Sequence, residues 1–362
     1  MASTRRRFLL GAAAMGGAAF GGRAAPWDGS VQADSIPSER STTALSPSEL
    51  LGRHVPPRSA NTNDHVSVTP TQDPRIPTSE EVESWYTKYR NWGRWGNNDQ
   101  LGAINLITPE KRTAAAALIK TGRTVSLSRV FEPEQQFIRK GSSGRGGYVI
   151  DYYGFIYHGR TVTHVDALCH MWDRDGMWNG RNPDEQIDTL GAKFGDITAW
   201  SEGIITRGVL IDVPRHRGES HVTLEKPVHG WELEEIARSQ GVDVTSGDAL
   251  LVHSGLEAYE TANKGRDVTD RPGLHASCIK YIRDHDVALL GWDLMDARND
   301  YTVPFPVHGI LFNYGIALLD NALLGPLAAA CAEEGRYEFM FMLLPLRVSR
   351  GTGSPANPIA MF

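Results

Sequence analysis

The sequence predicts a mixed fold of strands and helices, of the α/β or the α+β class. Short apolar segments bounded by Gly, Asp or Pro indicate strands, and segments with helix-start signals lie between some of them. The 362 residues are 41% hydrophobic and 22% charged, an ordinary composition for a globular protein with a large core. Periodicity alone does not decide between the two classes.

Five segments are predicted to be helical. Residues 79–90 begin with Ser79 and two glutamates, and Thr108 followed by Pro109 opens a helix that runs to residue 117. The other three are residues 231–239, 274–284 and 323–334. The predicted strands are rich in Val, Ile, Leu or Phe and span residues 124–127, 208–213, 249–252, 287–291 and 339–344.

The first 78 residues do not have the pattern of a folded domain. Residues 1–25 contain Arg5-Arg6-Arg7, a glycine-interrupted apolar run and small residues, which resembles a bacterial twin-arginine export signal. The alternative is a disordered basic tail. We expect a protein exported to the periplasm or the extracellular space. Residues 26–78 are rich in Pro and Ser and predict a linker or an arm, and residues 79–362 form the single large domain.

Charge and cysteine content exclude several classes of protein. The formal net charge is −6, which argues against a nucleic-acid partner. The apolar run near the amino terminus is too short and too rich in glycine to span a membrane. The three cysteines allow at most one disulfide, so the core must hold the fold. We therefore expect no nucleic-acid partner and no membrane partner after export.

A glycine-rich loop at residues 91–102 contains Trp92 and Trp95. Two indoles in such a loop are not the pattern of a core segment. They are expected either to form an aromatic wall for a flat substrate or to clamp the loop onto the domain.

Residues 157–170 are the most informative segment, because three of the twelve histidines fall within thirteen residues here, His158, His164 and His170, together with Asp166. In a strand, residues two apart share a face at about 6 to 7 Å, so His164 and Asp166 can reach one ion. Imidazole and carboxylate suit zinc, manganese or iron better than calcium. Each residue alone has an ordinary structural interpretation, but burying several ionisable groups is costly unless they share a ligand or a network.

Thr163, His164, Asp166 and His170 match the pattern T-H-x-D-x-x-x-H. The segment resembles the signature of the cyclase family of metal-dependent hydrolases, which includes kynurenine formamidase and isatin hydrolase. The resemblance extends to residues that look like its exported or larger branch, at positions 91–96, 99–102, 247–252, 345–346 and 351–358. It implies an α/β fold with a swivelling β/β/α barrel-like mixed sheet, a divalent metal, zinc or manganese, and a homo-oligomer, dimer or tetramer.

In the family, a second His and an acidic residue complete the metal site, and the resemblance assigns these roles to His308 and Asp320, where Glu is common. Asp320 is also expected just before the helix near residue 323, where exposed amides favour a carboxylate.

Two positions depart from the family pattern. Arg160 stands where the family has a His ligand, and Leu168 replaces a proline. The nearest histidine, His158, would lie about 20 Å from His164 in an extended strand. It could share the metal only if residues 159–162 form a turn or bulge. A single metal is therefore expected rather than two. Arg160 either points out while His158 takes its place, which we favour, or points in as a fixed cation for a substrate carboxylate or an oxyanion.

The resemblance implies hydrolysis of a carbon-nitrogen (amide) bond in an aryl formamide or a cyclic amide or imide. His170 would be the general acid/base for metal-activated water, with Trp92, Trp95 and Arg160 binding substrate.

Alternative interpretations stay open. Cys169 could act as a nucleophile. Asp293 and Asp296 could line the pocket, although caps of the loop after residues 287–291 are favoured. A non-catalytic exported protein that binds a metal or a small molecule with the same fold would explain Arg160.

Overall fold

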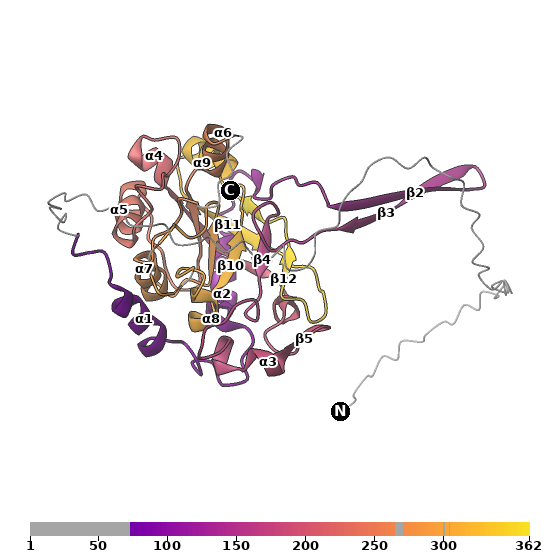
Figure 1. Cartoon of the computed structure of the whole chain (residues 1–362). Helices are drawn as coiled ribbons and strands as arrows, with labels where there is room; N and C mark the ends of the chain where they lie inside the picture. Colours follow the sequence, from indigo (N-terminus) through magenta and orange to yellow (C-terminus); the bar gives the residue numbers. More distant parts are fainter. Residues whose placement is uncertain (1–72, 265–270, 300, 304) are drawn as a thin grey trace, which may run out of the picture. The chain divides into compact units, whose positions relative to one another are not determined.

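The computed structural model describes residues 73–264, 271–299, 301–303 and 305–362 (Figure 1). The predicted export signal, residues 1–25, and residues 26–72 of the predicted linker lie outside the described residues. Among the described residues, no helix combines the length and apolar character needed to cross a membrane.

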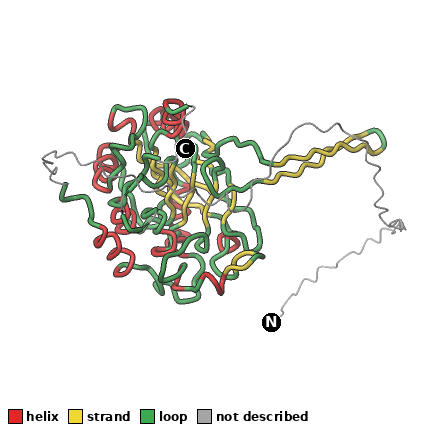
Figure 2. The backbone as a smooth tube through the Cα atoms, in the orientation of Figure 1, coloured by secondary structure: helices red, strands yellow, loops and turns green. Residues whose placement is uncertain are grey.

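A nine-stranded, curled mixed sheet with surrounding helices organises the described residues (Figures 1 and 2). Its strand order is β1-β13-β11-β7-β8-β9-β10-β4-β12. The four neighbours β7, β8, β9 and β10 are parallel, and the other pairs are antiparallel. The strands are β1 (Thr124–Ser126), β4 (His164–Asp166), β7 (Ile204–Asp212), β8 (Ala249–His253), β9 (Leu289–Trp292), β10 (Ala317–Asp320), β11 (Glu338–Leu343), β12 (Gly353–Pro355) and β13 (Ile359–Met361). The predicted mixed sheet with surrounding helices is thus confirmed.

Helices follow most of the predicted segments. The α-helices are α1 (Ser79–Lys88), α2 (Pro109–Ala116), α3 (Pro183–Gln186), α4 (Val213–Arg217), α5 (Gly230–Gln240), α6 (Leu256–Ala262), α7 (Cys278–Asp284), α8 (Ile310–Tyr314) and α9 (Gly325–Glu334). Short 3-10 helices span Gly102–Leu106, Trp178–Gly180 and Ile197–Trp200. Thr108 caps α2 as predicted, whereas the cap of α1 is Thr78, whose hydroxyl accepts the Glu81 N–H.

Two predicted helices begin later than the sequence suggested. Leu274 forms isolated β-bridges with Val228 and Asp296, so its backbone is extended and α7 starts only at Cys278. Pro326 lies in the first turn of α9, where proline is favoured, and α9 starts only at Gly325.

The core lies around the central parallel strands. All residues of β8, β9 and β10 are buried, the near-continuous apolar pattern of strands covered on both faces. Trp178 and Trp292 are the two largest fully buried side chains. This core fixes β10, and β10 in turn holds the short strand β4.

The sequence interpretation missed two hairpins. β5 (Ile187–Asp188) pairs with β6 (Gly191–Ala192), and β2 (Gln135–Ser143) pairs with β3 (Gly146–Gly154). The β2–β3 hairpin stands apart from the nine-stranded sheet in Figure 1, and its two strands pair only with each other. Most of its residues are exposed, so it lacks the buried face that would mark a strand in the sequence.

Candidate metal centre

Strand β4 carries the centre of the site and lies between β10 and β12, with every residue buried. His164 and Asp166 are two residues apart and share one face, with His164 Nε2 3.4 Å from Asp166 Oδ1. On β10, Asp320 lies directly opposite His164, and its Oδ2 is 3.9 Å from His164 Nε2. Strand pairing therefore brings these three side chains together across the sheet.

His158 reaches the same place because the chain before β4 is not extended. Residues 158–162 form bends, with Gly159 at φ +146°. His158 Nδ1 lies 2.9 Å from Asp166 Oδ1, and its Nε2 lies 3.0 Å from Thr352 Oγ1. The chain therefore forms the turn that His158 needs in order to reach the same site as His164 and Asp166.

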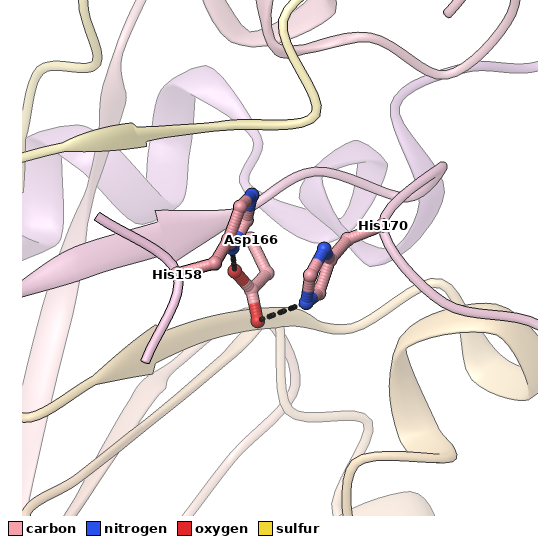
Figure 3. Close-up of side chains that lie close together, drawn as sticks. All are labelled: His158, Asp166 and His170. Carbon is pink, nitrogen blue, oxygen red and sulfur yellow. Dashed lines mark ion pairs between the residues drawn. The ribbon is translucent and has the colours of Figure 1, made fainter. Parts of the chain in front are cut away.

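His170 approaches the second oxygen of the Asp166 carboxylate (Figure 3). A turn after β4, in which the His170 N–H donates to the Ala167 carbonyl, brings the ring back. His170 Nε2 is 3.8 Å from Asp166 Oδ2, and the ring stacks on His158 with centroids 3.8 Å apart. The Asp166 carboxylate thus lies along the edges of two stacked imidazoles, with one oxygen near each ring.

The donor set around Asp166 fits a metal ion better than a hydrogen-bond network. Neither Asp166 oxygen has a hydrogen-bond donor among the described residues, although the side chain is buried. His158 Nδ1 lies close to the carboxylate without hydrogen-bond geometry. Burial raises the pKa of Asp166, but the charges of His170, His158 and His164 outweigh it and lower the pKa below its usual range. A buried carboxylate with orphaned oxygens is costly unless a cation compensates it.

The tautomer of His164 also favours metal binding. Its Nδ1 lies 2.8 Å from the Val162 carbonyl, which can only accept, so Nδ1 carries the proton. Nε2 is left with its lone pair directed to Asp166 and Asp320. A backbone carbonyl that orients a histidine in this way is common around bound metals.

Two groups of three side chains could hold an ion, His158-Asp166-His170 and His164-Asp166-Asp320, and the ligand atoms of each lie within 4.8 Å of one another. Because the groups share Asp166, they form one continuous centre. Its residues fit one ion or two that share this carboxylate.

Next to this centre, His308 contacts the same Asp320 oxygen that lies near His164. His308 Nε2 lies 3.2 Å from Asp320 Oδ2, its Nδ1 pairs with Asp296, and Trp292 Nε1 donates to Asp320. Burial lowers the pKa of His308, but the charges of Asp296 and Asp320 outweigh it and raise the pKa well above its usual value. Asp320 ends β10 and is held by these contacts, rather than by the start of α9 as the sequence suggested.

A cavity of about 920 Å³ opens beside the centre. His164, His170, His308 and Asp320 line it, and so does Arg160. Arg160 therefore lies on the cavity wall while His158 lies against Asp166.

Neither Trp92 nor Trp95 is among the described residues that line this cavity. Trp92 Nε1 donates to the Phe312 carbonyl at 2.7 Å, and Trp95 packs against Trp178 with ring centroids 6.2 Å apart. These contacts correspond to the second expectation for the loop, that its indoles clamp it onto the domain.

Cys169 is not a nucleophile in this structure. Its side chain is fully buried, and burial raises the pKa of the thiol to about 12. The group is therefore a neutral thiol at ordinary pH, and a neutral thiol is a poor nucleophile.

The favoured prediction for Asp296, a cap of the loop after residues 287–291, is wrong. Asp296 lines the cavity, which was the alternative, and it pairs with His308, which was not predicted. Asp293 does act as a cap, although of a different segment, since it accepts the N–H groups of Ser254, Gly255 and Leu256. The sequence signal that could have indicated this role is the position of the two aspartates directly after β9, because functional groups gather where parallel strands end.

Comparison with known proteins agrees with the fold. The family profile Cyclase, described as "Putative cyclase", matches residues 112–297. A crystal structure described as a novel cyclase is 28% identical, with a TM-score of 0.68 and coverage of 75% of this chain and 99% of that chain. No curated protein matches the chain.

Isatin hydrolases are weaker structural matches. Isatin hydrolase A from Labrenzia aggregata is 16% identical with a TM-score of 0.47, and covers 68% of this chain and 94% of its own. Isatin hydrolase A from Ralstonia solanacearum is 17% identical with a TM-score of 0.47, and covers 70% of this chain and 97% of its own.

Gly353 on β12 tests how the fold positions the ligands. A Cβ at this position would lie 2.6 Å from the Val165 carbonyl and 2.8 Å from His158 Cε1. We therefore expect Gly353→Ala to displace His158 and to weaken zinc binding about 10- to 100-fold in a chelator competition, as loss of a supporting group does. Gly146→Ala is the control, because the nearest atom to its added Cβ is 3.7 Å away. Equal zinc affinities of the two variants would contradict this role of Gly353.

Proposed function

The chain belongs to the Cyclase family, and on this premise we propose that it is a metal-dependent hydrolase of a carbon-nitrogen (amide) bond. The observation that carries the proposal is the buried Asp166 carboxylate, flanked by imidazoles beside an open cavity. The proposed substrates are aryl formamides and cyclic amides or imides, which the resemblance of residues 157–170 to the family signature implies.

In this proposal His158, His164, Asp166 and Asp320 hold a divalent ion, zinc or manganese. When bound, such an ion polarises a carbonyl and lowers the pKa of a coordinated water towards neutrality. His308 and Trp292 keep the Asp320 carboxylate in place through their contacts with its two oxygens. The protein thus supplies both the ligands and the groups that fix them.

His170 is the proposed general acid/base. It lines the cavity, and burial lowers its pKa, so the ring is neutral at ordinary pH and can accept a proton at Nε2. Stacking on His158 restricts the ring to one orientation. His170 can then return this proton to the leaving nitrogen.

A non-catalytic metal- or small-molecule-binding protein with the same fold is the second candidate. Arg160 favours it, since the position has lost the histidine of the family pattern. The closeness of His158 to Asp166 weighs against it, because a replacement histidine is in place.

Metal removal tests the hydrolase proposal. Treatment with a chelator should lower turnover at least about 100-fold across a panel of aryl formamides, lactams and imides, and zinc or manganese should restore it. Asp166→Asn should not regain metal or activity, because both ligand groups share this carboxylate. Turnover that survives complete metal removal would refute the proposal.

Replacing His170 distinguishes the two candidate functions. His170→Gln should lower kcat by about 10²- to 10⁴-fold while metal content, measured by elemental analysis, stays that of the wild type. His216→Gln is the matched control, because His216 is exposed on α4. If every detected activity survives His170→Gln with the metal bound, the binding-protein interpretation replaces the catalytic one.

We also propose that the chain forms a homo-oligomer, a dimer or tetramer, through the β2–β3 hairpin. Phe137, Ile150 and Tyr152 on one face and Ile138 and Tyr153 on the other are each more than half exposed. An isolated two-stranded hairpin is marginally stable in water, so these side chains need a cover. The hairpin contains three basic residues and one acidic residue, whereas the whole chain has a formal net charge of −6. The positive hairpin therefore complements the negative charge of a second copy, which favours a second copy as its partner.

Light scattering of full-length protein at micromolar concentration should show a dimer or tetramer. The double variant Ile138→Asp and Ile150→Asp should be monomeric with an unchanged melting temperature, because it charges both faces of the hairpin and leaves the core intact. Val130→Asp, a fully exposed position outside the hairpin, is the control. A monomeric wild type would contradict the proposal.

Export through the twin-arginine route is proposed on the sequence of residues 1–25 alone. This route usually carries proteins already folded, which suits a protein that acquires its metal before export.

A further inference from the structure

Arg271 lines the same cavity as His170 and Asp320, and among the described residues its guanidinium donates hydrogen bonds to uncharged groups. Nη1 donates to Asn321 Oδ1 at 2.8 Å and lies 3.5 Å from the Asp293 carbonyl, and Nη2 donates to the Arg160 carbonyl at 3.0 Å. No carboxylate forms an ion pair with Arg271 in the part of the chain that the structure describes.

Arg271 thus has no ion-pair partner among the described residues. Burial, and then the charge of Arg160, lower the pKa of Arg271 to about 10, so it remains a cation at neutral pH. Its Nε–H has no acceptor among the described residues, yet the atom is not shut off from solvent. A partly desolvated cation is costly unless an anion pairs with it, and the open cavity is where an anion can enter.

The guanidinium is fixed relative to the metal centre. Asn321, which accepts from Arg271, follows Asp320 and donates through Nδ2 to the carbonyls of Gly159 and Val162. Thr163 Oγ1 in turn donates to the Asn321 carbonyl at 2.7 Å. Arg271 is therefore tied to the bend that positions His158 and to the end of β10.

The carboxylates of the cavity wall do not oppose an anionic ligand at Arg271. The two acids among the described lining residues, Asp296 and Asp320, are both engaged by His308. No unpaired carboxylate of the described lining residues is therefore left to repel an anion beside Arg271.

We propose that Arg271 binds a carboxylate of the substrate, so that the natural substrate is an amide that carries a carboxylate group apart from the scissile bond. This inference rests on the proposed hydrolase function and names its substrate class. The accessible edge of the guanidinium can pair with both oxygens of a carboxylate, a geometry that lysine cannot reproduce. The alternative is that Arg271 only holds neighbouring segments together through its hydrogen bonds. In that role it would not select between charged and neutral ligands.

Binding of benzoate and of neutral benzamide, measured by titration calorimetry on the full chain, tests the inference without turnover. The wild type should bind benzoate about tenfold more tightly than benzamide, and Arg271→Gln should remove this preference while leaving benzamide binding unchanged. Arg238→Gln is the control, because Arg238 is exposed on α5. A bound metal ion also attracts benzoate, so the titrations use both metal-loaded and chelator-treated protein. Arg271→Gln should lose the preference for benzoate in both forms.

A benzoate preference that is absent from the wild type, or that persists in Arg271→Gln, would overturn the inference. If Arg271→Gln does not fold, as its melting temperature will show, Arg271→Lys decides. That variant keeps the positive charge without the planar guanidinium and should bind benzoate several-fold more weakly than the wild type; unchanged binding would overturn the inference.

Kinetics with paired acidic and neutral amides provide a second test. Arg271→Gln should raise KM for the acidic amide alone with little change in kcat. Failure of the hydrolase proposal would appear separately, as no metal-dependent turnover despite selective benzoate binding.

Discussion

The site depends on one buried charge, the carboxylate of Asp166. Its oxygens have no hydrogen-bond donor among the described residues, and imidazoles from three positions approach it. A carboxylate removed from water is tolerated only when opposite charge or hydrogen bonds replace its hydration. The two candidate ligand groups, the stacked rings of His158 and His170 and the orientation of His164 are all arranged around this requirement.

The rest of the fold holds the partners of Asp166 at fixed positions. β10 places Asp320 opposite His164, and β12 places Gly353 opposite Asp166, where a side chain would collide with His158. Asn321 ties the bend before β4 to the end of β10. Because these contacts come from strands on both sides of β4, the geometry of the centre is a property of the sheet and not of one loop.

Much of this arrangement could be predicted from local patterns. The two-residue spacing of His164 and Asp166 indicates a shared face, and Thr108-Pro109 marks a helix start, because both depend on neighbours in the sequence. The pairing of Asp296 with His308 and the contacts of Arg271 could not be predicted, since each depends on a partner brought close only by the folded sheet. The bend at residues 158–162 falls between these cases: the sequence indicated that His158 required a turn but not that one forms.

The most direct test of this account is a crystal structure of metal-loaded protein, with anomalous diffraction recorded at the absorption edges of zinc and manganese. The account predicts an anomalous peak within coordination distance of Asp166 and His164, with a nitrogen of His158 directed at it. An Asp166 that accepts hydrogen bonds from protonated His158 or His170, with no anomalous peak in its vicinity, would contradict the account.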